Sequence, residues 1–269
     1  MSAAPDVTVG VVSWNDAPAL ARCLAALPLA IGDLRAQIVV VDNGSTDDTW
    51  ALLEGRDDLE AIRNEGNRGL TPGRNQILER ARGRALVMLD SDTEPLPGSI
   101  AVLCAYLDEH PQVGLVGARL LDPDGALQLS CRTFPPATLP FMRRPPLSRV
   151  FEHRATVNRH LMRDFDHASP RAVDWVMGAC QCTRGDLARR LGGYDERIFS
   201  HGGEDTDWCV RVWKAGYEVH YVPDAEVVHA YGHFTRRNPF SKQSLRGLAD
   251  YFYMQAKHRD VRGGLTGAG

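Results

Sequence analysis

The sequence predicts an α/β fold in which helices flank a mostly parallel central sheet. Short apolar, β-branched runs alternate with segments of helical pattern through the first half of the chain, and this alternation is typical of βαβ units. The runs are almost continuously apolar, as expected of strands that are covered on both faces. With 269 residues, the chain is long enough for one large domain with an appended lobe.

The first half contains five predicted strands, each an apolar run that ends in polar or turn-forming residues. They cover residues 7–13, 37–41, 61–63, 85–89 and 113–121. Four predicted helices lie between them, over residues 17–26, 45–53, 72–82 and 97–109. Asp16 caps the first of these helices, and Ser45 or Thr46 caps the second.

The second half departs from this alternation. Residues 132–174 contain six prolines and show little periodicity, which indicates a functional loop or a mobile lid. The regular pattern then returns with strands over residues 174–182 and 218–222, and with helices over residues 184–191, 206–215 and 242–259. The sequence therefore predicts a loop-rich lobe beside the sheet, followed by a last helix and a Gly-rich tail.

Composition excludes several functional classes. The formal net charge is −3 and the isoelectric point is near 6.3, whereas generic nucleic-acid binding normally needs a strongly basic balance. The six cysteines form no C-x-x-C pair, which favours small core residues in a reducing compartment. The sequence shows no signal peptide and no apolar run of the ~18 residues that a membrane span needs. We therefore expect a cytoplasmic protein that binds no nucleic acid.

Two carboxylates follow the predicted strand 85–89. Asp90 and Asp92 are one residue apart, so an extended backbone points both side chains the same way, where they can bind one hard cation. The alternative is that the pair caps the helix that follows. His229 ends the apolar run 225–228 and can complete a metal site at a strand end. Arg236 and its neighbour Arg237, further along, suit a diphosphate.

Other polar residues lie where strands or loops end. Asp42 closes the strand 37–41 and can accept hydrogen bonds from a base or a ribose, or it can simply cap the turn. Asn67, Gly69 and Asn75 frame a loop-to-helix transition that suits phosphate, although a capped surface turn is the simpler interpretation. Both interpretations of each position stay open at this point.

Glu204 and Asp205 are adjacent acids at the start of a predicted helix. Acids in a first turn are ordinary partners of the helix dipole. One of them can instead act as a general base, because two neighbouring carboxylates repel and tend to raise one pKa. By itself the pair favours capping.

Taken together, these motifs resemble the family 2 glycosyltransferases, which have the GT-A nucleotide-sugar fold. The matching segments run in the expected order over almost the whole chain: Val9-Gly10-Val11-Val12-Ser13-Trp14-Asn15, Val40-Val41-Asp42-Asn43-Gly44-Ser45-Thr46-Asp47, Asn67-Arg68-Gly69 with Asn75, Leu89-Asp90-Ser91-Asp92, Gly192-Gly193-Tyr194-Asp195-Glu196, Glu204-Asp205-Thr206-Asp207, and Val222-Pro223 leading to His229. Trp14 stands where tyrosine is usual, and Gly202-Gly203 looks one glycine longer than the commonest spacing. The acidic motif and the Pro/Arg-rich loop are similar to those of bacterial rhamnosyltransferase-like members.

The resemblance implies an inverting, metal-dependent transfer of a sugar from a nucleoside-diphosphate sugar to an acceptor hydroxyl, in bacterial surface glycan or glycolipid synthesis. Asp92 and His229 would bind Mn²⁺ or Mg²⁺, and Asp205 would be the general base, with Glu204 as the alternative. The donor-binding residues would be Ser13, Asn15, Asp42, Asn67, Gly69, Asn75, Asp90 and Arg236. Residues 1–122 would form the donor-binding half, residues 123–240 the acceptor-binding and catalytic half of the same domain, and residues 241–269 a C-terminal helix and flexible tail.

Two other functional classes compete with this one. A sugar-phosphate nucleotidyltransferase would need a Gly-rich basic loop after the first strand, where this chain has Ser13-Trp14-Asn15-Asp16. A non-catalytic nucleotide-sugar-binding module would not need the acidic residues that turnover requires. All of these acidic residues are present in the chain, which counts against this class. Release of a nucleoside diphosphate distinguishes the transferase from both.

The acceptor is expected to be a glycan or a lipid-linked glycan. Residues 143–171 carry seven arginines, and the last helix places basic side chains beside aromatic ones. This combination suits an anionic membrane surface, although the helical spacing of the apolar residues also predicts burial against the sheet. We hypothesise peripheral docking at the inner face of the membrane.

Overall fold

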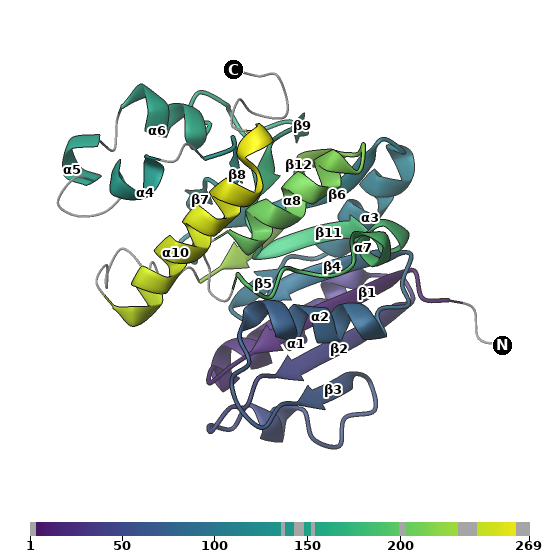
Figure 1. Ribbon diagram of the computed structural model, residues 1–269. Coiled ribbons are helices and arrows are strands. Elements are labelled where there is room, and N and C mark those ends of the chain that lie inside the picture. Colours follow the sequence, from purple (N-terminus) through teal and green to yellow (C-terminus); the bar gives the residue numbers. More distant parts are fainter. Residues whose placement is uncertain are drawn as a thin grey trace.

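The computed structural model describes residues 4–135, 138–142, 148–151, 154–198, 203–230 and 241–261. At its centre is a sheet with the strand order β3-β2-β1-β4-β11-β6-β12-β5 (Figure 1). These strands are β1 Val7–Ser13, β2 Ala36–Asp42, β3 Glu60–Arg63, β4 Ala85–Asp90, β5 Thr93–Pro95, β6 Val113–Leu121, β11 Cys180–Arg184 and β12 Glu218–His229. Four short strands complete the fold: β7 Leu127–Gln128, β8 Cys131–Arg132, β9 Arg171–Ala172 and β10 Trp175–Val176.

The sheet is mostly parallel, as predicted. Strands β3, β2, β1 and β4 run in the same direction, and β6 is parallel to β12. Because β11 is antiparallel to both of its neighbours, β4 and β6, β6 points the same way as β4. The carboxyl ends of β1, β2, β4, β6 and β12 therefore meet at one edge, which is where open α/β sheets bind their ligands.

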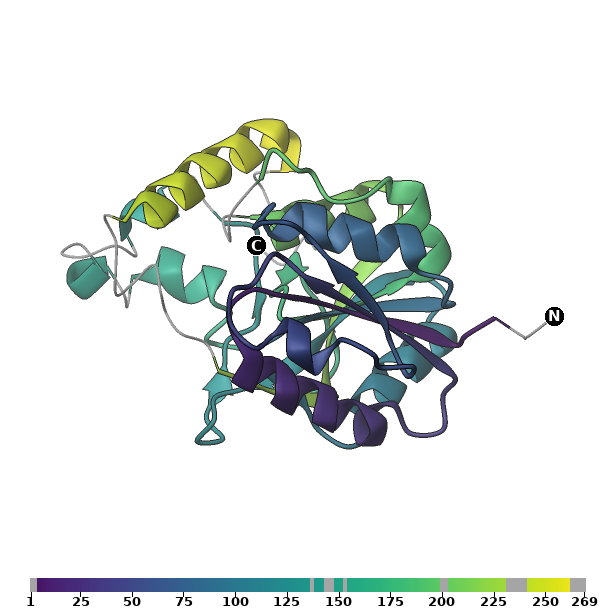
Figure 2. The same ribbon diagram turned by 90° about the horizontal axis from the view of Figure 1, so that it is seen from below.

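Helices cover both faces of the sheet (Figure 2). The first face carries α1 (Ala17–Ile31) and α3 (Ser99–Glu109), and the second carries α2 (Leu70–Arg80), α7 (Gly185–Leu191) and α8 (Glu204–Lys214). Strand β4 belongs to both cores, since Val87 and Leu89 join the first cluster and Leu86 and Met88 the second. Successive side chains of a strand point to opposite faces, which explains the continuous apolar run.

A lobe of short helices projects from one side of the sheet: α4 (Leu139–Met142), α5 (Ser148–Phe151) and α6 (Ala155–His160). The long helix α10 (Lys242–Lys257) runs beside it and over α8, to the left in Figure 1. None of the helices in the described ranges is long and apolar enough to cross a membrane.

Two predicted helices are wrong in extent. The first continues past Pro28 to Ile31, because burial of Ala30 and Ile31 in the core outweighs the lost backbone hydrogen bond. The second is reduced to the 3₁₀ turn η1, Trp50–Leu52. There the Asp47 carboxylate accepts from the backbone N–H of Ala17 and of Thr49, and such side-chain bonds compete with helix formation.

Two predicted strands also differ. The strand over residues 174–182 is divided into β10 and β11 by a turn at residues 177–179. The strand over residues 218–222 continues as β12 to His229, through an irregularity between Val222 and Glu226. Its far end pairs with β5, which was not predicted, so that His229 lies opposite Thr93. This pairing brings His229 to the Asp90–Asp92 segment.

Candidate active site

Three side chains form a candidate cation site at the carboxyl edge of the sheet. Ligand atoms of Asp90, Asp92 and His229 all lie within 4.8 Å of one another. Asp90 ends β4, and His229 ends β12 beside Asp92, whose carbonyl oxygen accepts from Ala230 N at 3.0 Å. The distance from His229 Nε2 to Asp92 Oδ1 is 3.5 Å. The structure thus brings together residues that are about 140 positions apart in the chain.

Gln128 orients the imidazole of His229, and no pattern in the sequence indicated this residue. Gln128 Nε2 donates to Asp122 Oδ1 at 2.6 Å and to the His229 carbonyl oxygen at 2.7 Å. Its Oε1 must therefore accept from His229 Nδ1, which lies 2.9 Å away. With the proton on Nδ1, Nε2 presents its lone pair toward Asp92. A hydrogen bond of this kind to the remote ring nitrogen is typical of a metal-binding histidine.

The three residues fit a divalent cation. Burial and the neighbouring Asp90 raise the pKa of Asp92, because two carboxylates side by side repel each other. A cation between them would remove this repulsion. Two carboxylates and one imidazole are ligands that suit Mn²⁺ or Mg²⁺.

Arg74 connects this cluster to the acidic pair of α8. Its side chain is only 2% exposed, and Nη2 lies 2.9 Å from Asp90 Oδ1. Nη1 lies 3.9 Å from Glu204 Oε1 and has no hydrogen-bond partner within the described residues. Burial alone would lower the pKa of Arg74, but Asp90 and the other acidic groups around it raise it. Arg74 lies within the loop-to-helix transition between Asn67 and Asn75, for which only phosphate binding or a capped surface turn was considered.

Glu204 and Asp205 begin α8, which starts two residues before the predicted helix. Glu204 is buried, whereas Asp205 is partly exposed. Asp205 Oδ2 accepts from Gly178 N at 3.2 Å, and Oδ1 accepts from Thr206 N at 2.7 Å. Burial nevertheless raises the pKa of Asp205. A carboxyl group with a raised pKa at the edge of a sheet is suited to general-base chemistry.

The turn at residues 177–179 contacts both Asp205 and Arg74. Gly178 donates its N–H to Asp205 and accepts from Arg74 Nη2 at 3.1 Å. A Cβ at Gly178 would lie 3.1 Å from the Arg74 guanidinium nitrogens and 3.3 Å from Asp205 Cβ. A side chain here would be in tight contact with both groups, so the arginine and the acid would have to shift by a few tenths of an ångström to admit it.

The predicted donor-binding residues at the ends of β1 and β2 lie side by side. Ser13 pairs in register with Asp42, and both side chains are buried. Asp42 Oδ1 accepts from Ser45 N at 2.9 Å, which is the predicted turn cap. Within the described residues, Ser13 Oγ and Asp42 Oδ2 have no hydrogen-bond partner. Asn15, with φ of 52°, joins this edge by accepting from Thr46 N at 2.8 Å.

A pocket of about 520 Å³ lies beside these residues and is lined by residues 63–68. Asn67 Oδ1 accepts from Gly69 N at 2.9 Å, and Gly69 starts α2 with a φ of 95° that favours glycine. Arg63 Nε is 3.7 Å from Asp42 Oδ2. Asp42, Asn67 and Gly69 thus belong to one edge of the sheet.

Asn75 has a different environment from the one predicted. Its side chain bonds the backbone N–H and carbonyl of Tyr194 at 2.6 and 3.1 Å, and it also donates to Glu196 at 2.9 Å. The amide is thereby engaged in holding the segment after α7. Arg236, the remaining predicted donor contact, lies outside the described residues, as does Arg237.

Comparison with known proteins identifies the family. The family described as "Glycosyl transferase family 2" matches residues 8–163, more than half of the chain. A second family, described as "N-terminal domain of galactosyltransferase", matches residues 149–236. The chain is 29% identical over 270 residues to the N-acetylglucosaminyl-diphospho-decaprenol L-rhamnosyltransferase of Mycobacterium tuberculosis, an alignment that covers 93% of this chain and 84% of that protein.

Two solved structures show the same fold. The crystal structure of GalNAc-T7 with UDP, GalNAc and Mn²⁺ gives a TM-score of 0.64 at 18% identity, covering 94% of this chain and 48% of that one. The mannosyltransferase PcManGT of Pyrobaculum calidifontis, in complex with GDP-Man and Mn²⁺, gives a TM-score of 0.57 at 22% identity. That match covers 94% of this chain and 71% of the mannosyltransferase chain. This chain thus spans about half the length of the first structure. The predicted GT-A fold is confirmed, and the chain belongs to glycosyltransferase family 2.

Proposed function

We propose that the protein is an inverting, metal-dependent glycosyltransferase that moves a sugar from a nucleoside-diphosphate sugar to an acceptor hydroxyl. The observation that carries this proposal is the continuous chain of charges at the sheet edge. It runs from the Asp90–Asp92–His229 cluster through the buried Arg74 to Glu204 and Asp205. A cation site and a carboxylate base are the two elements that such a transfer needs.

Asp92 and His229, with Asp90 beside them, would hold Mn²⁺ or Mg²⁺, which when bound neutralises the negative charge of a departing diphosphate. Asp42 and Ser13 would bind the nucleoside, since each offers a buried oxygen without a hydrogen-bond partner within the described residues. Asn15 and the pocket lined by residues 63–68 would complete the donor side. Asn75 would support the donor site through the Tyr194 backbone.

Asp205 would act as the base rather than Glu204. Asp205 is the more exposed of the two and its pKa is raised, whereas Glu204 faces the Arg74 cation. Asp205 would take the proton of the acceptor hydroxyl while the acceptor oxygen bonds to the anomeric carbon and the bond from that carbon to the diphosphate oxygen breaks. A single displacement of this kind inverts the anomeric configuration.

The acceptor would be a lipid-linked glycan reached at the cytoplasmic face of a membrane. The mycobacterial relative is named for a diphospho-decaprenol substrate. On α10, Met254 is buried, as the burial hypothesis predicted, but Leu245 is 50% exposed and Phe252 37% exposed. Arg246 of the same helix is exposed, as are Arg154 and Arg159 at the start and near the end of α6. An apolar helix face beside basic side chains suits an anionic bilayer.

Replacing Asp92 with Asn is expected to reduce turnover by roughly 100-fold or more, because it removes a charged ligand that supports electrostatic stabilisation. The assay follows nucleoside diphosphate release from UDP-, GDP- and dTDP-sugars in the presence of Mn²⁺. The exposed Asp33 provides a control, and Asp33→Asn should retain wild-type turnover. Full activity in excess EDTA would contradict a metal-dependent mechanism.

Asp205→Asn is expected to lower kcat by about 10²–10⁴-fold and to leave binding of the donor nucleotide nearly unchanged. Wild-type kcat should fall as the pH is lowered through the raised pKa of Asp205, because only the ionised carboxylate accepts a proton. The measurements are kcat and donor-nucleotide affinity for the wild type and Asp205→Asn, and wild-type kcat as a function of pH. If Glu204→Gln is inactive while Asp205→Asn turns over normally, the roles of the two acids are reversed.

The same substitution has an expected effect on stability. A carboxyl pKa that is higher in the folded state means that ionised Asp205 opposes folding at neutral pH, and that stability is regained as the pH falls through that pKa. Asp205→Asn should therefore unfold in urea at pH 7 with a free energy equal to or above that of the wild type. This outcome also shows that the loss of activity is not caused by misfolding.

Membrane docking is tested by co-sedimentation with phosphatidylglycerol vesicles at ~0.1 M salt, where surface charge is only partly screened. The variant with Leu245→Ser and Phe252→Ser is expected to bind at least about tenfold more weakly, since it removes two exposed apolar side chains. Leu29→Ser alters an exposed leucine on α1, at the opposite face of the sheet, and should bind like the wild type. Absence of wild-type binding would favour a soluble acceptor.

A further inference from the structure

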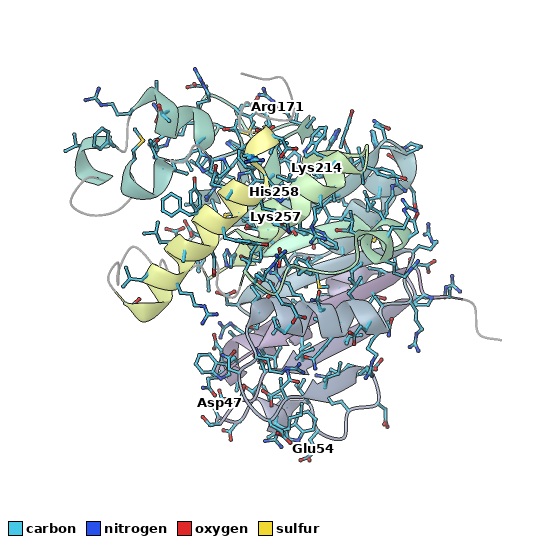
Figure 3. The ribbon with its side chains drawn as sticks, viewed as in Figure 1. Asp47, Glu54, Arg171, Lys214, Lys257 and His258 are labelled. Atoms are coloured by element: carbon cyan, nitrogen blue, oxygen red, sulfur yellow. The ribbon has the colours of Figure 1, made fainter. Side chains whose placement is uncertain are left out.

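Helix α10 lies outside the two family matches, which end at residue 236, yet its last turn reaches the helix that carries the acidic pair. Lys257 Nζ and His258 Nε2 lie 2.6 and 2.7 Å from the same oxygen of Asp207, Oδ1. Figure 3 shows Lys257 and His258 next to Lys214, where α10 ends over α8. The contact thus joins the C-terminal helix to the first turns of α8.

Asp207 is a buried anion that depends on these contacts. Its carboxylate is 1% exposed, and its other oxygen, Oδ2, bonds Arg211 Nε at 2.9 Å. Burial alone would raise the pKa of Asp207, but the hydrogen bond from His258 and the charges of Arg211 and Lys257 lower it. Removing a partner from such a buried charge is strongly destabilising to the local structure.

The tautomer of His258 follows from its second contact. Lys214 Nζ lies 3.1 Å from His258 Nδ1, and an ammonium group can only donate a hydrogen bond. Nδ1 must therefore accept, so the ring proton is on Nε2 and is donated to Asp207. Lys214 is itself fixed by Asp260 at 2.9 Å. A glutamine at position 258 would keep a donor for Asp207, whereas an alanine would not.

An apolar contact of α10 reaches the same turn of α8. Met254 is fully buried, and its Cβ and Cγ lie 3.4 Å from the position of a Cβ on Gly203, the residue before Glu204. Gly203 in turn accepts from Asp207 N at 2.7 Å. Helix α10 therefore contacts the residues on both sides of Glu204 and Asp205.

The same helix also fixes the segment that follows α7. Lys257 Nζ and Tyr253 Oη lie 2.8 and 2.9 Å from Asp195 Oδ2. Asp195 follows Tyr194, whose backbone is held by Asn75 of α2. Lys257 therefore joins α10 both to Asp207 of α8 and to the segment that follows α7.

We propose that α10 is a clamp that sets the position of Glu204 and Asp205, with Lys257, His258 and Met254 as positioning residues that touch neither substrate nor metal. The proposal rests on the proposed role of the acidic pair in transfer. It implies that substitutions of these side chains, which lie outside the family-matched region, change kcat. The same substitutions should leave nucleotide binding at the donor side, built on β1, β2 and β4, unaffected.

The test compares His258→Ala, His258→Gln and Lys257→Met with Arg259→Gln, which changes an exposed neighbour in the 3₁₀ turn Arg259–Val261 that follows the helix. We expect His258→Ala and Lys257→Met to lower kcat by between ~10-fold and ~10²-fold, as small displacements of catalytic groups do. The Kd for UDP, GDP or dTDP with Mn²⁺ should change less than about twofold. His258→Gln should recover most of the activity, and Arg259→Gln should match the wild type.

Hydrogen exchange provides a readout that does not depend on turnover. Amides of residues 204–208 should exchange faster in His258→Ala and Lys257→Met than in the wild type, because local opening of α8 becomes easier, and at the wild-type rate in Arg259→Gln. Unchanged exchange and unchanged kcat in both variants would overturn the clamp. Nucleotide affinity that falls as much as kcat would also overturn it. If the wild type turns over no nucleotide sugar, the proposed function fails, while the exchange data still decide on the clamp.

Discussion

The guanidinium group of Arg74 lies in the interior between carboxylates that arrive from different parts of the chain. It is 2.9 Å from Asp90 at the end of β4 and 3.9 Å from Glu204 at the start of α8. A buried cation is expensive unless it is paired and hydrogen-bonded, and here the pairing also satisfies acids that would otherwise repel one another. Gly178 leaves room for this arrangement, since a Cβ there would lie only 3.1 Å from the guanidinium nitrogens. The relative positions of the cation site and the acidic pair depend on this arginine.

The remaining site geometry follows from non-local pairing within the sheet. His229 reaches Asp92 because β12 continues past an irregularity and pairs with β5. Gln128 then sets the tautomer of the imidazole through its contacts with Asp122 and the His229 backbone. On the other side of Arg74, the Gly178 N–H, Lys257 and His258 hold the first turns of α8. The site is therefore assembled by a strand, a turn and a helix that are far apart in the sequence.

The sequence allowed prediction of those features that local physical rules determine. The apolar runs 7–13 and 113–121 became strands with the predicted bounds, because continuous burial on both faces leaves a clear pattern. Asp90 and Asp92 were predicted to face one cation because they follow an apolar strand, and the family resemblance implied His229 as a ligand together with Asp92. Arg74 and Gln128 were missed, since an arginine or a glutamine within an ordinary polar segment gives no sign that tertiary contacts bury it. The helix expected over residues 45–53 failed for a related reason, because Asp47 bonds the distant Ala17 backbone.

The central claim is that Arg74 holds the cation site and the acidic pair in one arrangement. It is tested most directly by measuring turnover and Mn²⁺-dependent nucleoside diphosphate binding in Arg74→Met. The matched control is Arg80→Met, which removes an exposed arginine from the same helix. Breaking the buried pairs should lower the free energy of unfolding by about 3–5 kcal/mol. In the molecules that remain folded, kcat should fall by roughly 100-fold or more and nucleotide binding should weaken, while Arg80→Met behaves like the wild type. A folded Arg74→Met variant with wild-type turnover and wild-type nucleotide affinity would contradict the account.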